Sequence, residues 1–228
     1  MAISIYLSSH PQTHSNLCWA STSQSILELY GIEVTQDSLA KWVMKMNHND
    51  SLNSPNRLYG EPGSVCELLA EFGNIGTVYE PKPLSYEYIE EEINAGRPII
   101  ISVYQRPNYH TQIIYGVQDS TLLLLDPTYG YMKQEYKLYE ITCDHNLILR
   151  SSVTLSDKAY EFYNSTIQGI EFVGYTPKAT IAVYDDCYRQ LAMQLINGHT
   201  VRVKLVPGEY KILISDSGRM IYKILKVQ

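Results

Sequence analysis

A cysteine that begins an apolar, helix-like segment is the side chain whose setting most suggests chemistry. Residues 11–31 read PQTHSNLCWASTSQSILELYG, so a polar, turn-prone run ends just before Cys18, and apolar residues then recur at helical spacing until Gly31. The first turn of a helix has unpaired N–H groups and lies at the positive end of the helix dipole. Both stabilise an anion, so the thiolate of Cys18 is favoured relative to the thiol and the pKa of the thiol falls. We predict that Cys18 is a nucleophile.

Gln12 lies shortly before this cysteine and outside the predicted helix. Its side-chain amide is a hydrogen-bond donor that can fold over beside the thiol. A nucleophile with such a donor next to it forms half of an acyl-transfer site, because the donor stabilises the oxyanion of the transition state. We therefore predict that Gln12 belongs to the same site.

The order of Gln12 and then Cys18-Trp19 at a helix start resembles the active site of the papain-like cysteine peptidases. The resemblance implies a His, and then an Asn or Asp, later in the chain. The sequence has His110 at the start of one strand-like run and Asp126 at the end of the next, directly before Pro127. Peptidases that remove double-glycine bacteriocin leaders are a similar subtype, because they also have Asp followed by Pro. The likeness covers about residues 1–155.

A hairpin would bring the His and the Asp together. If residues 117–119 form its loop, His110 and Asp126 lie directly opposite each other on neighbouring strands. Directly opposed residues have Cβ atoms roughly 4.5–5.5 Å apart and point to the same face of the sheet. At that distance a carboxylate can orient an imidazole, although a slip of one residue would separate the pair.

These residue types imply a catalytic mechanism. Cys18 attacks a carbonyl carbon, and His110 takes the thiol proton and later gives a proton to the leaving amine. Asp126 holds the imidazole in one tautomer and stabilises its charged form. Gln12 and the backbone N–H of Cys18 hold the developing oxyanion.

Cysteines can also be buried structural residues, and cysteines and histidines can also bind metals. Cys66 lies on the apolar face of a predicted helix, and Cys143 and Cys187 have neither a nearby Gln nor a helix start, so all three are predicted to be structural. The chain has no C-x-x-C pair; His10 and His14 lie in a loop beside Pro11, and His145 and His199 are isolated. We expect neither a metal nor a cofactor.

Composition agrees with a soluble globular enzyme. The 228 residues are 45% hydrophobic and 18% charged, and the net charge of −6 without a basic cluster makes nucleic acid a poor partner. We see neither a secretory signal nor an apolar run long enough to insert into a membrane. Four cysteines, one of them predicted to be catalytic, argue against a disulfide framework. We expect a cytoplasmic protein, or one exported by a route that needs no signal peptide.

The element pattern predicts an α+β, papain-like fold with two lobes. Helices are expected at residues 18–31, 35–46, 63–72 and 85–94, and strands at 99–104, 111–117, 122–125, 132–138 and 147–150. Such an order places the cysteine on a helical lobe and the His and Asp on an antiparallel β lobe. The polar segment 47–62 is predicted to be a loop near the cleft between the lobes.

Residues 156–228 lie outside the resemblance and are predicted to form a small C-terminal all-β domain, after a peptidase domain at 1–155. Short strands are expected at residues 179–184, 188–196, 200–206, 210–215 and 220–227, separated by turn signals. The segment has no catalytic constellation. Its expected roles are to cover a sheet edge, to self-associate, or to bind a partner or substrate.

Three functions fit the sequence. The favoured one is a cysteine peptidase that acts on a peptide or protein. The second keeps the triad but transfers the acyl group to another acceptor or deamidates glutamine. The third is a peptide-binding module without catalysis, although all four chemical positions are filled.

Overall fold

The computed structural model describes residues 2–47, 58, 63–73, 75–105, 108–150, 158–162, 165–171, 180–185, 189–195, 200–216 and 219–227. The helices are α1 (Cys18–Leu29), α2 (Gln36–Asn47), α3 (Val65–Gly73), α4 (Tyr86–Asn94) and α5 (Tyr136–Thr142). The strands of the N-terminal part are β1 (Ala2–Ser4), β2 (Gly76–Glu80), β3 (Ile99–Gln105), β4 (Asn108–Gln118), β5 (Thr121–Asp126), β6 (Gly130–Glu135) and β7 (Cys143–Arg150). Those that follow are β8 (Lys158–Phe162), β9 (Ser165–Glu171), β10 (Thr180–Tyr184), β11 (Gln190–Leu195), β12 (Thr200–Lys204), β13 (Gly208–Asp216) and β14 (Arg219–Val227).

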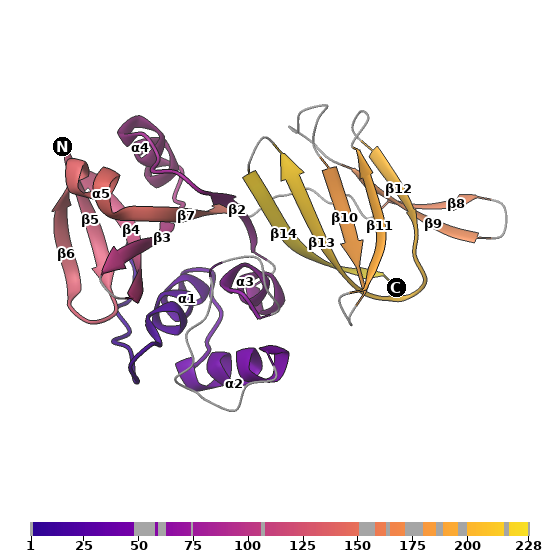
Figure 1. Ribbon diagram of the computed structural model, residues 1–228, viewed down its shortest axis with the longest axis horizontal. Coiled ribbons are helices and arrows are strands. Elements are labelled where there is room, and N and C mark those ends of the chain that lie inside the picture. The colour runs from indigo at the N-terminus through magenta and orange to yellow at the C-terminus, as the bar shows by residue number, and fades with distance from the viewer. Residues whose placement is uncertain are drawn as a thin grey trace.

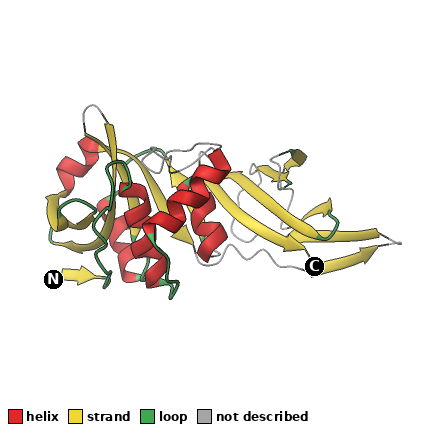
Figure 2. Ribbon diagram, turned by 90° about the horizontal axis from the view of Figure 1, so that it is seen from below, coloured by secondary structure: helices red, strands yellow, loops and turns green. Residues whose placement is uncertain are grey.

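One antiparallel sheet runs through both parts of the chain. Its strand order is β11-β10-β13-β14-β2-β7-β3-β4-β5-β6, and β1 adds to β4 beside this path. A second sheet has the order β12-β9-β8. Figure 1 shows the main sheet passing from the helical part into the strand-rich part, and Figure 2 shows the helices confined to the former. The fold is therefore α+β, as predicted.

Helices cover both faces of the N-terminal strands. In Figure 1, α4 and α5 lie on one side of these strands, and α1, α2 and α3 lie on the other. The alternation along β3 builds the two cores, because Ile99 and Ile101 pack with α4 and α5 whereas Ile100 packs with α1 to α3. None of the helices in the described part of the chain has the length and hydropathy needed to span a bilayer.

Four predicted helices are confirmed as α1 to α4, and the ends of α2 and α4 follow from their sequence. Thr35 Oγ1 accepts a hydrogen bond from the N–H of Ser38 at 3.2 Å before α2, and Ser85 caps α4 by accepting from the N–H of Tyr88 at 3.2 Å. The loop predicted at residues 47–62 lies outside the described residues, apart from its first residue and Leu58.

The strand predicted at residues 132–138 is wrong at its C-terminal end. β6 stops at Glu135, and α5 begins at Tyr136. The reason is tertiary, because Tyr139 is completely buried and its hydroxyl accepts from the N–H of Leu84 at 2.9 Å while donating to Asn146 Oδ1 at 2.7 Å. A helical turn brings this ring into the core, where burial outweighs a weak local preference. The prediction also missed strands β1, β2, β8 and β9.

The predicted register of the β4–β5 hairpin is wrong as well. Gln118 pairs with Thr121, so the loop is the two residues Asp119 and Ser120, and Asp119 has a positive φ of 45°. The register then shifts between Ile114 and Gly116, where β4 bulges. A side chain at Gly116 would collide with β1, since a Cβ there would lie 2.7 Å from the carbonyl oxygen of Ile3. Beyond the bulge Ile113 pairs with Leu125, and the next step places Gln112, not His110, opposite Asp126.

The boundary predicted at residue 155 falls in a stretch outside the described residues, but the parts on either side are in contact. β14 pairs with β2 through Met220 to Tyr79 and two further residue pairs, which joins the two halves of the main sheet. Lys211 Nζ on β13 lies 2.9 Å from Glu67 Oε1 on α3, and the two side chains are 5% and 1% exposed. Glu67 Oε2 also accepts from the N–H of Gly63 at 2.7 Å.

Substitution of Lys211 by Met should strongly destabilise the protein, because it leaves the Glu67 carboxylate buried without its cation. Removal of one partner of a buried pair costs about 3–5 kcal/mol, whereas replacement of both by apolar residues is often close to neutral. Chemical denaturation should therefore show a large loss for Lys211→Met and a partial recovery for Lys211→Met combined with Glu67→Leu. Equal losses in the single and double variants would contradict a coupling between the two side chains.

Candidate active site

Cys18 is the first residue of α1, as the sequence predicted. Asn16 has a left-handed φ of 66°, a conformation that Asn adopts more readily than most residues, and it turns the chain into the helix. Leu17 at the N-cap is buried and gives no side-chain cap, so no side chain of the cap competes for the first N–H groups of α1. Cys18 itself is 9% exposed.

His110 and Asp126 contact each other despite the different register. His110 Nε2 lies 2.8 Å from Asp126 Oδ2, and the two side chains are 14% and 0% exposed. Since Gln112 is opposite Asp126, His110 reaches the carboxylate from the diagonal position on the same face, which remains within range of a long side chain. With Nε2 on the carboxylate, Nδ1 is the ring nitrogen left for Cys18, which also raises the pKa of the imidazole.

The Asp126 carboxylate is held by four donors. Oδ1 accepts from the N–H of Thr128 at 2.7 Å and from the N–H of Tyr129 at 3.0 Å, in the turn that follows β5. Oδ2 accepts from His110 and from Gln112 Nε2, the latter at 2.6 Å. Both oxygens are therefore fixed, one by the backbone and one by two side chains of β4.

The charges of the three side chains support one another. Burial raises the pKa of the Cys18 thiol, but hydrogen bonds from His110 and Thr111 outweigh it and hold this pKa below its ordinary value. Burial lowers the pKa of His110, but contact with Asp126 and Cys18 raises it to about 9. Burial likewise opposes the ionised Asp126, yet its donors, His110 first, lower its pKa to about 2. These contacts stabilise the thiolate, the imidazolium and the carboxylate relative to the neutral forms of the three side chains.

Gln12 lies on a segment that is fixed next to the end of β5. Its backbone N–H donates to the carbonyl of Pro127 at 3.0 Å. Gln36, buried at the start of α2, holds the residues on either side: its Nε2 donates to the Pro11 carbonyl at 3.0 Å, and its Oε1 accepts from the N–H of Thr13 at 2.9 Å. The side-chain Oε1 of Gln12 is buried and has no hydrogen-bond partner among the described residues.

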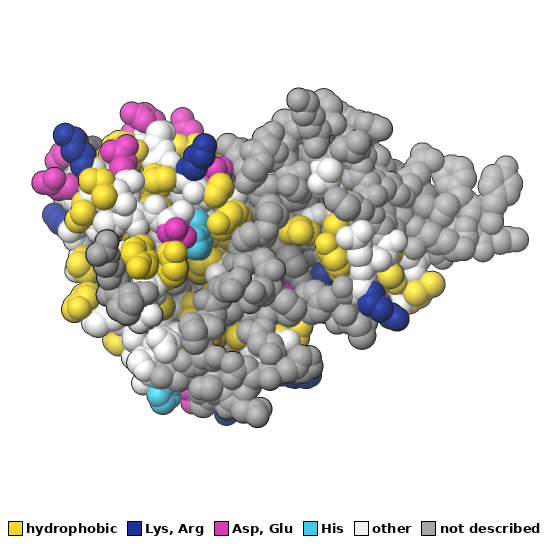
Figure 3. Space-filling view, in the orientation of Figure 1, with side chains coloured by type: hydrophobic (Ala, Val, Ile, Leu, Met, Phe, Trp, Pro, Cys, Tyr) yellow, Lys and Arg dark blue, Asp and Glu magenta, His cyan; other side chains and the backbone are white. Residues whose placement is uncertain are grey.

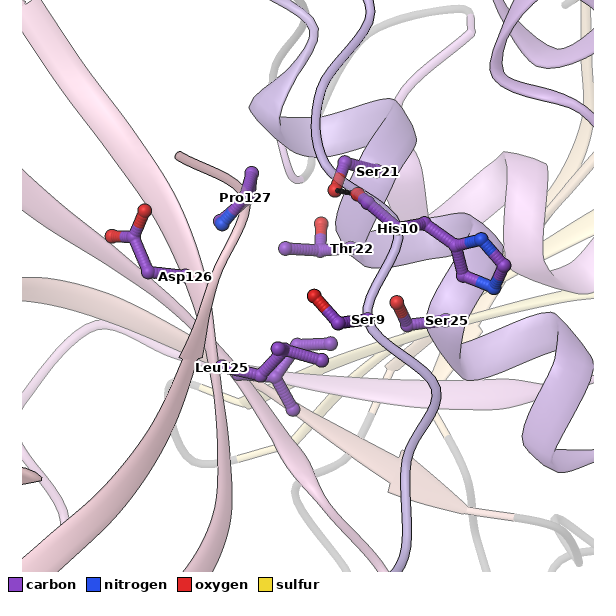
Figure 4. A pocket seen from close by; sticks show the side chains of 9 residues that line it. Ser9, His10, Ser21, Thr22, Ser25, Leu125, Asp126 and Pro127 are labelled. Carbon is purple, nitrogen blue, oxygen red and sulfur yellow. Dashed lines mark hydrogen bonds between the residues drawn. The ribbon is translucent and has the colours of Figure 1, made fainter. Parts of the chain in front are cut away.

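A narrow crevice separates this N-terminal segment from α1 and β5 (Figure 4). It has no room for a water molecule. The hydroxyl of Ser21 donates to the carbonyl of His10, and the His10 ring bonds to Glu28 instead of entering the site. Figure 4 shows Leu125 turned toward the α1 residues and Asp126 turned to the other side of its strand. The crevice is thus a packing contact that keeps the Gln12 segment against α1.

In the described part of the chain, neither Cys66 nor Cys143 nor His145 has a hydrogen bond or ion pair to Cys18, His110 or Asp126. Burial raises the pKa of Cys66 to about 12 and that of Cys143 to about 12, which keeps both as unreactive thiols. His145 Nδ1 pairs with its neighbour Asp144 Oδ2 at 2.6 Å. Cys187 and His199 lie outside the described residues.

Three residues of the site were missed by the sequence analysis. Thr111 donates to the Cys18 sulfur, Gln112 donates to Asp126, and Gln36 holds the Gln12 segment. Gln112 could have been noticed, because a long amide two residues after His110 shares its face of the strand. No sequence signal connects Gln36 with Gln12, because their contact depends on how α2 packs.

Comparison with known proteins identifies the family of this chain. The profile of the Peptidase C39-like family matches residues 5–147, and no curated protein matches the chain. A C39-like peptidase from Bacillus anthracis is 15% identical with a TM-score of 0.50, covering 66% of this chain and 98% of its own. The peptidase domain of Streptococcus ComA, a bi-functional ABC transporter involved in a quorum sensing pathway, is 16% identical with a TM-score of 0.48, covering 63% and 96%.

A double-glycine-motif protease from an AMS/PCAT transporter, in complex with its leader peptide, is 15% identical with a TM-score of 0.45, covering 64% of this chain and 92% of its own. At 15% identity, the Bacillus anthracis structure shows a shared fold alone. The family profile spans more than half of the chain and includes Cys18, His110 and Asp126. The chain belongs to the Peptidase C39-like family of papain-like proteins.

Proposed function

We propose that this protein is a cysteine peptidase that hydrolyses peptide bonds of a peptide or protein substrate through a thioester on Cys18. The observation that carries the proposal is the chain of contacts from Cys18 through His110 to Asp126. Membership of the Peptidase C39-like family supports the same reaction class. The catalytic roles of the three residues and of Gln12 are part of the proposal.

Acylation begins from the ion pair of Cys18 and His110. The thiolate attacks the carbonyl carbon, and the new C–S bond pushes negative charge onto the carbonyl oxygen. The Gln12 amide and the backbone N–H of Cys18 stabilise that oxyanion. The C–N bond then breaks as His110 gives its proton to the leaving amine, which leaves a neutral imidazole and a thioester.

Deacylation reverses these roles. Neutral His110 takes a proton from water, the hydroxide oxygen bonds to the thioester carbon, and the C–S bond breaks. The products are a carboxylic acid and the original pair of thiolate and imidazolium. Asp126 stays ionised throughout, because it accepts from His110 and three further donors, and it keeps Nδ1 of the ring facing the sulfur.

Exposed aromatic side chains beside the site favour a peptide as substrate. Tyr109 directly precedes His110 and is 58% exposed, and its ring centroid lies 5.2 Å from that of Tyr104, which is 47% exposed. Hydrophobic side chains gather on one face of the N-terminal part of the molecule (Figure 3). Such a surface can bind apolar side chains of an extended chain. Transfer of the acyl group to an acceptor other than water is the second candidate, since the same thioester serves it.

Incubation with a peptide library, read by mass spectrometry, should yield pairs of new amino and carboxyl termini. Cys18→Ala should abolish them, because no thioester can form, while Cys66→Ala should retain turnover. Oxygen-18 water should label the new carboxyl termini if water is the acceptor. Unlabelled adducts would instead indicate acyl transfer, and cleavage by Cys18→Ala would overturn the assignment of the nucleophile.

The rate of Cys18 alkylation by iodoacetamide should depend on pH in a way set by its neighbours. The rate falls on acidification as the thiolate is protonated, and the ion pair is lost as pH rises through about 9, where His110 releases its proton. Asp126→Asn removes the carboxylate that stabilises the imidazolium, so the His110 pKa falls and the alkaline transition moves to lower pH. Peptide mapping at each pH measures this.

Asp144→Asn is the matched control, because Asp144 pairs with His145 on β7 and not with His110. Its profile should match that of the unaltered protein. If both variants moved the alkaline transition equally, or neither moved it, the Asp126–His110 contact would not control the thiolate.

Gln12→Ala should lower kcat by about 10²–10³-fold with a small change in KM, because an oxyanion donor acts mainly in the transition state. Alkylation of Cys18 by iodoacetamide should be retained, since that reaction forms no oxyanion. Steady-state kinetics and peptide mapping on the same samples separate these effects. Parallel loss of alkylation and turnover would mean that Gln12 maintains the structure of the site instead.

A further inference from the structure

Gln112 is a polar residue in a buried stretch of β4. It lies on β4 beside Ile113 and Ile114, pairs with Ile101 on β3, and is 3% exposed. A buried amide is favourable only if its donors and acceptor are satisfied. Its Oε1 is buried and finds no partner within the described part of the chain. Such an unpaired acceptor costs stability, so the amide has to contribute something else at this position.

Among the described residues, the one hydrogen bond of this side chain leads to Asp126. Gln112 Nε2 lies 2.6 Å from Asp126 Oδ2, the oxygen that also accepts from His110. The orientation of the amide is fixed, since a flipped group would turn its oxygen against the carboxylate.

Asp126 does not need this bond merely to satisfy a buried carboxylate. Oδ1 already accepts from the N–H groups of Thr128 and Tyr129, and Oδ2 already accepts from His110. The additional donor restricts rotation of the carboxyl group about its Cβ–Cγ bond. It also withdraws negative charge from the oxygen that faces the imidazole.

We propose that Gln112 is a positioning residue of the reaction, which fixes the Asp126 carboxylate by donating to the same oxygen that receives His110. The inference rests on the proposed function. Gln112 acts through Asp126 and thereby sets how the imidazole of His110 is oriented and how strongly its proton is held. This balance matters because His110 must keep its proton beside the thiolate and then release it to the leaving amine.

Replacement of Gln112 by Met keeps the length of the side chain and removes both the donor and the unpaired oxygen. The expected result is a fall in kcat of about 10–100-fold with little change in KM, since the reacting groups lose their alignment. The melting temperature should not fall, because the orphaned acceptor is gone. A merely structural glutamine would instead lose stability and leave the chemistry of the folded fraction unchanged.

The pH dependence gives a second readout with a defined sign. The titratable groups that face His110 in the described residues are the Cys18 thiol on α1 and the Asp126 carboxylate on β5; His10 on the N-terminal segment is bound to Glu28. Loss of the Gln112 donor leaves more negative charge on Asp126 Oδ2, which stabilises the imidazolium. The alkaline transition of Cys18 alkylation should therefore move to higher pH in Gln112→Met.

Gln112→Glu tests the donor itself. Burial and the neighbouring carboxylate raise the pKa of the introduced acid. Its protonated form donates to Asp126 as the amide does, so kcat should be restored relative to Gln112→Met at acidic pH and lost again as the acid ionises. Gln134→Met on β6 is the control, because Gln134 Nε2 is also buried without a partner in the described structure and does not contact Asp126.

The experiment combines melting curves, steady-state kinetics and pH profiles of Cys18 alkylation for the three variants. A shift of the alkaline transition to higher pH in Gln112→Met alone, at an undiminished melting temperature, supports the proposal. An unmoved or lowered transition, or the same shift in Gln134→Met, overturns it. Alkylation needs no substrate, so a protein that shifts in this way but cleaves no peptide would retain the role of Gln112 while the proposed peptidase function fails.

Discussion

The Asp126 carboxylate is the point on which the geometry of the site depends. It joins the end of β5, the turn after it and two side chains of β4, and each of its four hydrogen bonds comes from a different donor. Because the group is almost completely buried, these donors offset a large desolvation penalty, and they leave the carboxylate no alternative orientation. The imidazole that it orients then faces a thiol whose own position is set by the start of α1. Pro127 directly follows Asp126, and its carbonyl accepts a hydrogen bond from the backbone N–H of Gln12. The predicted oxyanion donor is therefore held next to Asp126 as well.

The sheet that carries His110 and Asp126 is also the sheet that carries the C-terminal strands. β2 stands between β7 and β14, and a buried ion pair links α3 to β13. The core on the side of α4 and α5 includes Ile181 and Ile212, so apolar packing crosses from one part of the chain to the other. α3 also packs against α1, the helix that begins with Cys18. The strand-rich part is thus coupled physically to the elements of the candidate site, even though every predicted catalytic residue lies before residue 150.

The sequence was sufficient to identify the cysteine, histidine and aspartate that the structure brings together, because each lies at a recognisable end of an element. Cys18 begins a helix, His110 lies near the start of a strand, and Asp126 precedes a proline. The exact pairing was not predictable. The bulge between Ile114 and Gly116 follows from the close approach of β1, which no local pattern reveals. For the same reason α5 was mistaken for part of a strand, since the burial of Tyr139 decides its conformation. The roles of Gln36 and Gln112 also depend on tertiary contacts, so composition and periodicity could not separate them from ordinary polar residues.

Buried polar side chains without a hydrogen-bond partner lie among the residues of the candidate site. Elsewhere on β4 and β5 the inward positions are filled by Ile, Leu and Val, which need no partners. Among the described residues, Gln12 and Gln112 each bury an oxygen without a partner, and Trp19, next to Cys18, buries an N–H without one. Thr77 Oγ1 and Gln134 Nε2 are buried without a partner in the described structure outside the site. Such groups are rare in a protein interior, because each lowers stability by about 1–3 kcal/mol. The Gln112 oxygen is left unpaired on the same amide whose Nε2 bonds to Asp126, so the proposed role of Gln112 is one in which stability is given up to hold a donor in a fixed direction.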